Sequence, residues 1–163
     1  LYRLDPDLDW HRVDKGYCVT NGPALSPGDR TLYHTDTFES TIYAFDLSPD
    51  GKLSNKRVFV TIPEGDGYPD GMTCDAEGGL WLAHWGGWRI TRFLPDGSVD
   101  RVIEMPVAQV TSCTFGGADL DRLFITSARI GLSEEELEEQ PLAGSLFALD
   151  PGVKGLPGGL FGG

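Results

Sequence analysis

Basic residues are scarce in this sequence, and their scarcity excludes one class of partner. Lys and Arg number 13 against 25 Asp and Glu, so the formal net charge is −12. Proteins that bind nucleic acid neutralise its phosphates with clustered Lys and Arg, so we expect no nucleic-acid partner. Solvation of the surface is the ordinary reason for a negative net charge. The charge is also compatible with a cation site or a neutral small substrate.

Long apolar runs are missing as well. No stretch approaches the roughly 18 residues of a membrane-spanning helix, so we expect no membrane association. The chain opens with Leu1-Tyr-Arg-Leu-Asp-Pro6, which lacks the apolar segment of a secretory signal peptide. These two observations predict a cytoplasmic protein.

Cysteine is sparse, with only Cys18, Cys74 and Cys113. Their number is odd and their spacing fits no metal-binding motif. Each lies in or beside an apolar strand pattern, which predicts buried free thiols in a reducing compartment. The sequence also lacks a Gly-x-Ser-x-Gly elbow and any Ser, His and Asp set typical of an acyl-enzyme route.

Glycine and proline, by contrast, are frequent and regularly spaced, with 22 Gly and 11 Pro. They separate copies of one short motif, which begins at Leu1, Ile42, Ile90 and Leu146. Each copy alternates side chains with period 2 and then enters a turn, as a half-buried strand does. Two copies continue into hairpin turns and further strands, expected over 57–62 and 99–105.

Two other motifs accompany this one. The first reads Thr31-Leu-Tyr33, Gly79-Leu-Trp81 and Arg122-Leu-Phe124. The second opens each repeat with Asn21-Gly22, Asp70-Gly71 or Thr111-Ser112. Each repeat thus holds four short strands, and units of about 40–50 residues with four strands are typical of propeller blades.

The last repeat carries an insertion, and it contains the one helix that the sequence predicts. Residues 133–139 read Ser-Glu-Glu-Glu-Leu-Glu-Glu. Ser133 followed three residues later by Glu136 forms a capping box, which marks a helix start.

The first copy of the repeated strand stands at residue 1, without the earlier strands of its own blade. We therefore predict an all-β propeller of which this chain covers about three and a half C-terminal blades. Residues 1–163 would form a single domain that is incomplete at its N-terminus, because blades bury their faces against neighbours. A complete four-bladed propeller and a two-sheet sandwich are the alternatives.

The residues that open successive repeats are candidates for a metal site. Asn21 and Asp70 occupy the same position in two repeats, at the start of the innermost strand, and each is followed by Gly. Loops at one end of a propeller converge on the channel, where an amide oxygen and a carboxylate suit a hard divalent ion. The following Gly lets the backbone turn sharply. Asn-Gly and Asp-Gly are also common turn dipeptides with no ligand role.

Four tracts of the sequence resemble the SMP-30/gluconolactonase/luciferin-regenerating-enzyme family. They are 20–33 (TNGPALSPGDRTLY), 69–83 (PDGMTCDAEGGLWLA), 111–117 (TSCTFGG) and the ending 140–157. Members are six-bladed propellers, so the resemblance implies that the N-terminal blades lie outside this sequence. It also implies one divalent cation (calcium, zinc, manganese or magnesium) held by Asn21 and Asp70, with Asp70 as candidate general base.

The resemblance implies that other parts of the site lie elsewhere. The family's third protein ligand, a Glu, and its substrate-contacting Arg, Asn and Glu have no counterparts here. Substrate-binding residues therefore cannot be assigned, and the fragment alone is expected to be inactive. Of the remaining side chains, Tyr68 is a candidate for the site entrance. His84, Trp85 and Trp88 could line the channel mouth, although packing between blades is the favoured interpretation.

The activity that the resemblance implies is metal-dependent hydrolysis of a sugar lactone to the open-chain acid. A calcium-binding regulatory propeller without turnover, and a hydrolase of a non-sugar lactone or an organophosphate, remain open alternatives, because fold does not decide function. The sequence leaves the sugar, the metal and the oligomeric state undetermined.

Overall fold

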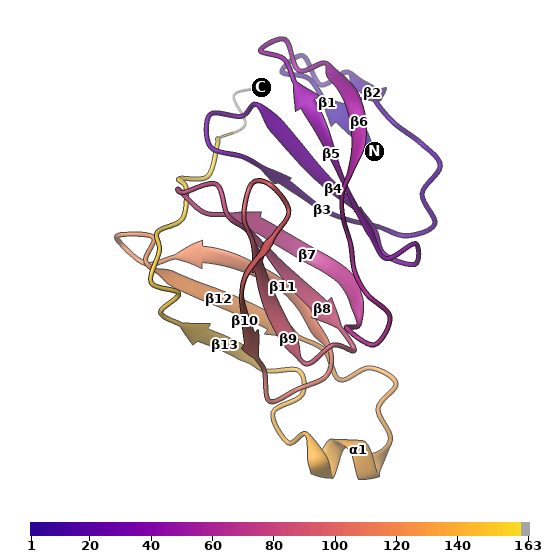
Figure 1. The fold of residues 1–163 in the computed structure, drawn as a ribbon, viewed down its shortest axis with the longest axis vertical. Coiled ribbons are helices and arrows are strands. Elements are labelled where there is room, and N and C mark those ends of the chain that lie inside the picture. The colour runs from indigo at the N-terminus through magenta and orange to yellow at the C-terminus, as the bar shows by residue number, and fades with distance from the viewer. Residues whose placement is uncertain (161–163) are drawn as a thin grey trace.

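The computed structural model describes residues 1–160, which form thirteen strands and one short helix (Figure 1). The strands are β1 (Tyr2–Leu4), β2 (Trp10–Arg12), β3 (Thr20–Leu25), β4 (Thr31–Asp36), β5 (Thr41–Leu47), β6 (Leu53–Thr61), β7 (Tyr68–Cys74), β8 (Leu80–Trp85), β9 (Arg89–Phe93), β10 (Val99–Glu104), β11 (Val110–Gly116), β12 (Arg122–Ser127) and β13 (Leu146–Leu149). The helix α1 spans Glu134–Glu139. Within the described residues, no helix is long and apolar enough to cross a membrane.

The strands form four antiparallel sheets in which sequence neighbours are also spatial neighbours. The orders are β1-β2, β3-β4-β5-β6, β7-β8-β9-β10 and β11-β12-β13. This succession of meanders is the blade pattern predicted from the repeats, and it confirms the all-β propeller over about three and a half blades. The two-sheet sandwich is wrong, because residues 1–160 form four sheets. The complete four-bladed propeller does not match either, because only two of these sheets have all four strands.

The core lies between successive sheets, and β8 shows how period 2 builds it. Leu80 and Leu82 pack into a cluster shared with β3–β5, whereas Trp81 and Ala83 pack into a second cluster shared with β11 and β12. All four side chains are fully buried. Because β8 has buried residues on both faces, its sheet packs between two neighbouring sheets. This blade therefore depends on both neighbours for its apolar contacts.

A β-bulge recurs at the same place in three sheets. The register of the first strand against the second slips by one residue between Asn21 and Ala24 in β3, between Pro69 and Met72 in β7, and between Val110 and Ser112 in β11. Each bulge coincides with the opening motif of its repeat. An extra residue on one strand bends it and re-aims the side chains beside it.

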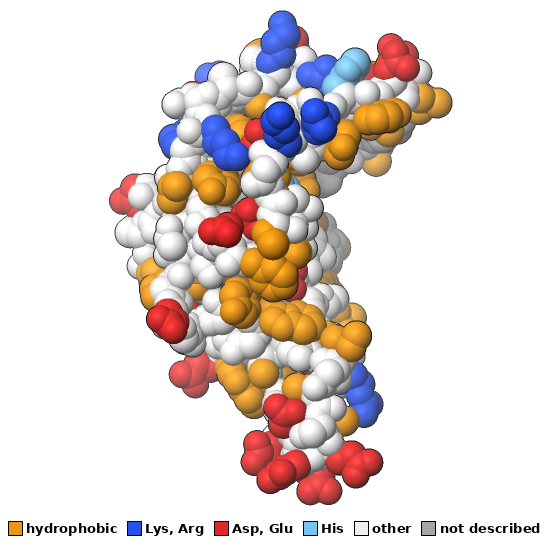
Figure 2. Space-filling model, turned by 90° about the vertical axis from the view of Figure 1, so that its right-hand side faces the viewer, with side chains coloured by type: hydrophobic (Ala, Val, Ile, Leu, Met, Phe, Trp, Pro, Cys, Tyr) orange, Lys and Arg blue, Asp and Glu red, His pale blue; other side chains and the backbone are white. Residues whose placement is uncertain are grey.

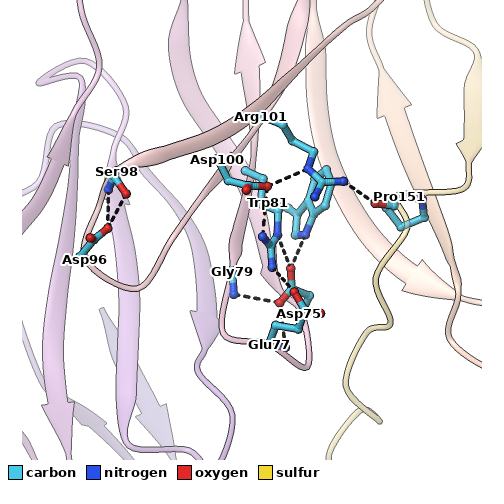
Figure 3. A network of polar contacts seen from close by, with 10 residues as sticks. Asp75, Glu77, Gly79, Trp81, Asp96, Ser98, Asp100, Arg101 and Pro151 are labelled. Carbon is cyan, nitrogen blue, oxygen red and sulfur yellow. Dashed lines mark hydrogen bonds and ion pairs between the residues drawn. The ribbon is translucent and has the colours of Figure 1, made fainter.

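A buried ion pair joins Asp75, which follows β7, to Arg92 on β9. Figure 3 shows the hydrogen bonds that converge on Asp75. The Asp75 carboxylate is fully buried and accepts hydrogen bonds from Arg92 Nε at 2.7 Å, Trp81 Nε1 at 2.8 Å and the backbone of Gly79 at 2.8 Å. The hydrogen bond to Asp75, and a further one to Asp100, raise the pKa of Arg92, which also pairs with Glu77. Sequence analysis did not identify this network, because its partners come from separate strands.

The short helix forms as expected. Ser133 accepts a hydrogen bond from the Glu136 backbone, and the Glu136 side chain accepts one from the Ser133 backbone, so the capping box is complete. No residue of α1 is buried. Figure 2 shows a crescent-shaped molecule with the carboxylates of this helix gathered at one tip. The helix is therefore a largely solvated insertion, which contacts the blades through Leu137, a partly buried side chain packed against the core cluster of β8, β11 and β12.

Two expectations are corrected by the structure. Cys18 is exposed, because it precedes β3 outside the core, whereas Cys74 and Cys113 are buried as predicted; all three are free thiols. The strand expected over 57–62 is longer and begins earlier, since β6 spans Leu53–Thr61. Its register against β5 shifts twice, which lets the pairing extend toward the hairpin turn.

His84 on β8 is buried with 2% of its surface exposed. Its Nδ1–H donates to the Asp66 carbonyl at 2.8 Å, and Nε2 has no hydrogen-bond partner within the described part of the chain. Burial lowers the pKa of His84 to about 4, against the opposing effect of the Asp66 carbonyl, because the imidazolium form would lose its hydration. This agrees with the favoured packing role.

Acidification should therefore destabilise the protein in a defined window. The pKa of His84 is 6.5 when unfolded and about 4 when folded, so the unfolded state binds the proton first. The stability that His84 contributes is complete above pH 6.5 and is lost as the pH falls toward 4. Urea unfolding at pH 7, 6 and 5 should show a shallower decline for His84→Gln. His11→Gln, on the exposed β2, is the control; a wild-type slope in His84→Gln would contradict the prediction.

Candidate functional site

The two predicted metal ligands line the same pocket. Asn21 on β3 and Asp70 on β7 border a cavity of about 330 Å³. The rest of its wall is formed by Val19, Thr37, Phe38, Tyr68 and Trp85. The structure therefore brings together, from two neighbouring sheets, the two residues that the repeat placed in equivalent positions.

The glycines that follow these residues have different physical roles. Gly22 has a φ of +83°, so the sharp turn expected there is present. Gly71 does not have a positive φ; it is needed for space, because a Cβ at this position would overlap the Ser112 side chain on β11. The expectation of a sharp turn at Gly71 is thus replaced by close approach of the neighbouring blade.

The Asn21 side chain is held by a hydrogen-bonded chain that crosses between sheets. Its Nδ2 donates to Thr37 Oγ1 at 2.9 Å, and Thr37 Oγ1 donates to the carbonyl oxygen of Pro69 at 2.9 Å. Pro69 directly precedes Asp70. Sequence analysis missed Thr37, although its position one residue after β4, at the same end of the blade as Asn21, was a usable signal.

Asp70 lies in an environment that disfavours its charge. Burial raises the pKa of its carboxyl to about 6, and a hydrogen bond from the Gly71 backbone opposes this shift. No side chain of residues 1–160 contributes a compensating positive charge or hydrogen bond to that pKa. A half-buried carboxylate without a counter-charge is a suitable ligand for a cation, because the cation would supply that charge.

The donor set here fits part of the coordination sphere of a hard divalent ion. Asn21 Oδ1 and the Asp70 carboxylate are the oxygen ligands that such ions prefer. Within the described residues, no group of three or more His, Cys, Asp or Glu is placed to hold a metal. Asn21 and Asp70 would therefore supply only part of the coordination sphere of an ion.

Aromatic side chains form the outer wall of the pocket. Phe38, in the turn after β4, contacts Tyr68 edge to face with ring centroids 5.9 Å apart. They are 61% and 45% exposed, respectively. Tyr68, the candidate for the site entrance, is part of the pocket wall. Trp85 is also part of that wall, as in the less favoured alternative to packing between blades, whereas Trp88 is not. Phe38 was not identified from the sequence, because a single aromatic residue in a turn carries no periodic signal.

Comparison with known proteins adds the family context. Residues 1–129 match the family model described as SMP-30/Gluconolactonase/LRE-like region. The chain is 39% identical over 160 residues to regucalcin of Danio rerio, covering 96% of this chain and 54% of that protein. It is 37% identical over 148 residues to the L-arabinolactonase of Azospirillum brasilense, covering 90% and 49%, respectively.

A solved structure shows the same fold. The calcium-binding protein regucalcin from Agrobacterium tumefaciens superimposes with a TM-score of 0.86 and 31% identity, over 91% of this chain and 51% of that chain. The chain thus spans about half the length of the curated relatives that it matches. On the family match and these identities, the chain belongs to the SMP-30/gluconolactonase/luciferin-regenerating-enzyme family.

Proposed function

We propose that the protein of which this chain is part hydrolyses a sugar lactone to the open-chain sugar acid with the help of one divalent cation. The observation that carries the proposal is the shared pocket of Asn21 and Asp70, which pairs an amide oxygen with an uncompensated carboxylate. Relatives that are named for lactonase activity, such as the L-arabinolactonase of Azospirillum brasilense, support the substrate class.

Both predicted ligands would bind the ion through oxygen atoms. Asn21 would present its Oδ1 and Asp70 its carboxylate to the ion. A divalent cation bound in such a site polarises the lactone carbonyl and stabilises the negative charge that develops on its oxygen. Asp70 is also the candidate general base; a cation beside it would lower the pKa of the carboxyl, so the role as ligand is better supported than the role as base.

The aromatic wall would position the substrate. Phe38, Tyr68 and Trp85 present apolar surface at the pocket. Such surface packs against the C–H face of a sugar ring and excludes water from the reacting carbonyl, while the few polar groups fix the orientation. A neutral lactone matches a pocket that carries a carboxylate but lacks Lys and Arg along its wall.

A proton-release assay tests the proposal on the full-length protein. A panel of aldonolactones, a non-sugar lactone and an organophosphate is offered with and without EDTA, followed by Ca²⁺, Mn²⁺, Zn²⁺ or Mg²⁺. We expect acid production from an aldonolactone that EDTA abolishes and one of the cations restores. Cation binding without turnover would instead support a regulatory calcium-binding protein. Turnover of only the non-sugar substrates would instead support a hydrolase of a non-sugar lactone or an organophosphate. Hydrolysis that EDTA leaves unchanged would refute the role of the cation.

A further inference from the structure

Thr37 occupies a fixed position between the two predicted ligands. Its backbone N–H donates to the Val19 carbonyl at 2.8 Å, and its carbonyl accepts from the Ser40 backbone at 3.0 Å, so the main chain is held on both sides. Only 7% of the residue is exposed. The hydroxyl therefore has a defined location with little competition from water.

The direction of its hydrogen bonds follows from chemistry. A carbonyl oxygen can only accept, so the single hydroxyl proton of Thr37 is donated to the Pro69 carbonyl at 2.9 Å. The hydroxyl oxygen is then left as an acceptor, and only the NH₂ group of Asn21, at 2.9 Å, can donate to it. The opposite amide orientation would place two acceptors against each other. The hydroxyl thus selects one of the two orientations of the Asn21 amide.

The selected orientation bears on the site. With Nδ2 bonded to Thr37, Oδ1 is the amide atom that remains free, and the Asn21 side chain lines the pocket that Asp70 shares. The second hydrogen bond of Thr37 ends on Pro69, the residue before Asp70 on the neighbouring sheet. One hydroxyl therefore orients one ligand and holds the strand that carries the other.

We propose that Thr37 is a positioning residue that fixes the Asn21 carbonyl oxygen toward the cation and sets the separation of Asn21 from Asp70. This inference rests on the proposed function, because it assumes that the two residues hold a cation. Groups that orient metal ligands through hydrogen bonds typically change metal affinity by about 10- to 100-fold when they are removed.

The test compares three variants of the full-length protein by calorimetric titration of the metal-free form with Ca²⁺ and with Mn²⁺. Thr37→Val removes the hydroxyl with little change in shape, and we expect it to weaken cation affinity about 10- to 100-fold. Thr37→Ser keeps the hydroxyl and should stay within about threefold of wild type. Thr41→Val is the matched control, since Thr41 is similarly buried and donates to the Glu39 carbonyl at 2.7 Å, away from Asn21.

Activity gives a second, independent measure. The cation concentration at half-maximal rate should rise about 10- to 100-fold in Thr37→Val and stay close to wild type in Thr37→Ser and Thr41→Val. A purely structural role would lower stability without this shift. If Thr37→Val does not fold, Thr37→Ala carries the same expectation with a smaller side chain.

The outcomes separate the two proposals. Wild-type affinity in Thr37→Val, together with loss of cation binding in an Asp70 variant, would overturn the role of Thr37 and leave the proposed function standing. An equal loss of affinity in Thr41→Val would also overturn it, because the effect would then be general to the turn. Absence of cation binding in the wild-type protein would overturn the proposed function itself.

Discussion

Asp70→Asn in the full-length protein should reduce lactone hydrolysis by about 10³-fold or more and abolish detectable cation binding. Removing one preorganised group that stabilises the developing oxyanion already lowers kcat by about 10²–10³-fold, and loss of a charged ligand would remove the ion that provides this stabilisation. Asn keeps the shape of the side chain, but removes its negative charge and replaces one acceptor oxygen with an NH₂ group. Initial rates on the responsive aldonolactone and calorimetric titration with Ca²⁺ and Mn²⁺ measure the two effects.

Asp70→Asn should not lower the stability of the cation-free protein, although it should greatly reduce activity. The pKa of Asp70 is 3.8 when unfolded and about 6 when folded, so the folded state binds more protons between these values. In the cation-free protein the ionised carboxylate therefore lowers stability above pH 6. Asp70→Asn lacks that charge, so its cation-free form should be at least as stable as wild type at pH 7, and an inactive variant is not simply unfolded.

A nearby carboxylate offers the control for this variant. Asp66 pairs with Arg89 on the surface and is not part of the pocket wall. Asp66→Asn makes the same chemical change four residues away and should retain activity. Wild-type turnover in Asp70→Asn would remove the basis of the proposed mechanism, whereas equal losses in both variants would indicate a general effect of charge.

Asp75→Ala should have the largest effect on stability, a loss of about 3–5 kcal/mol in the free energy of unfolding. The substitution leaves Arg92, whose side chain is 4% exposed, without its closest partner. It also leaves the buried Trp81 indole N–H and the Gly79 backbone N–H without an acceptor (Figure 3). Unpaired buried donors and charges lose their hydration without compensation. Urea unfolding at pH 7 measures the change.

An exposed pair calibrates this value. Asp46 on β5 pairs with Arg57 at 2.8 Å, and their side chains are 51% and 43% exposed, respectively. Asp46→Ala should therefore lower stability far less than Asp75→Ala, because solvent screens a surface ion pair. If Asp75→Ala lost no more than Asp46→Ala, burial would not be what makes the Asp75 pair important.

The parts of the fold that could be predicted are those that repeat. Strand positions followed from period-2 alternation and regular turns, and the alignment of Asn21 with Asp70 followed from the opening motif. The helix start at Ser133 was predictable because a capping box is a local interaction. Local and periodic signals survive in the sequence because they do not depend on which distant segment lies nearby.

Contacts between blades could not be predicted in the same way. The requirement for glycine at position 71 depends on Ser112, which lies in the next blade. The hydrogen bond on which the proposed role of Thr37 depends forms only because β7 brings the Pro69 carbonyl within 2.9 Å of its hydroxyl. The exposure of Cys18 depends on which surfaces cover the segment before β3. In each case the deciding neighbour is distant in sequence, and no motif marks the pair.

The recurring bulge allows the channel end of each blade to change its chemistry independently of its architecture. At or directly beside the bulge, successive blades carry an amide (Asn21), a carboxylate (Asp70) and a hydroxyl (Thr111), and in each blade the antiparallel pairing resumes after it. The residue at or beside the bulge therefore differs from blade to blade while the flanking ladder persists. A substitution at this point of one blade can thus alter the chemistry at the channel end without altering the strand pairing of the other blades.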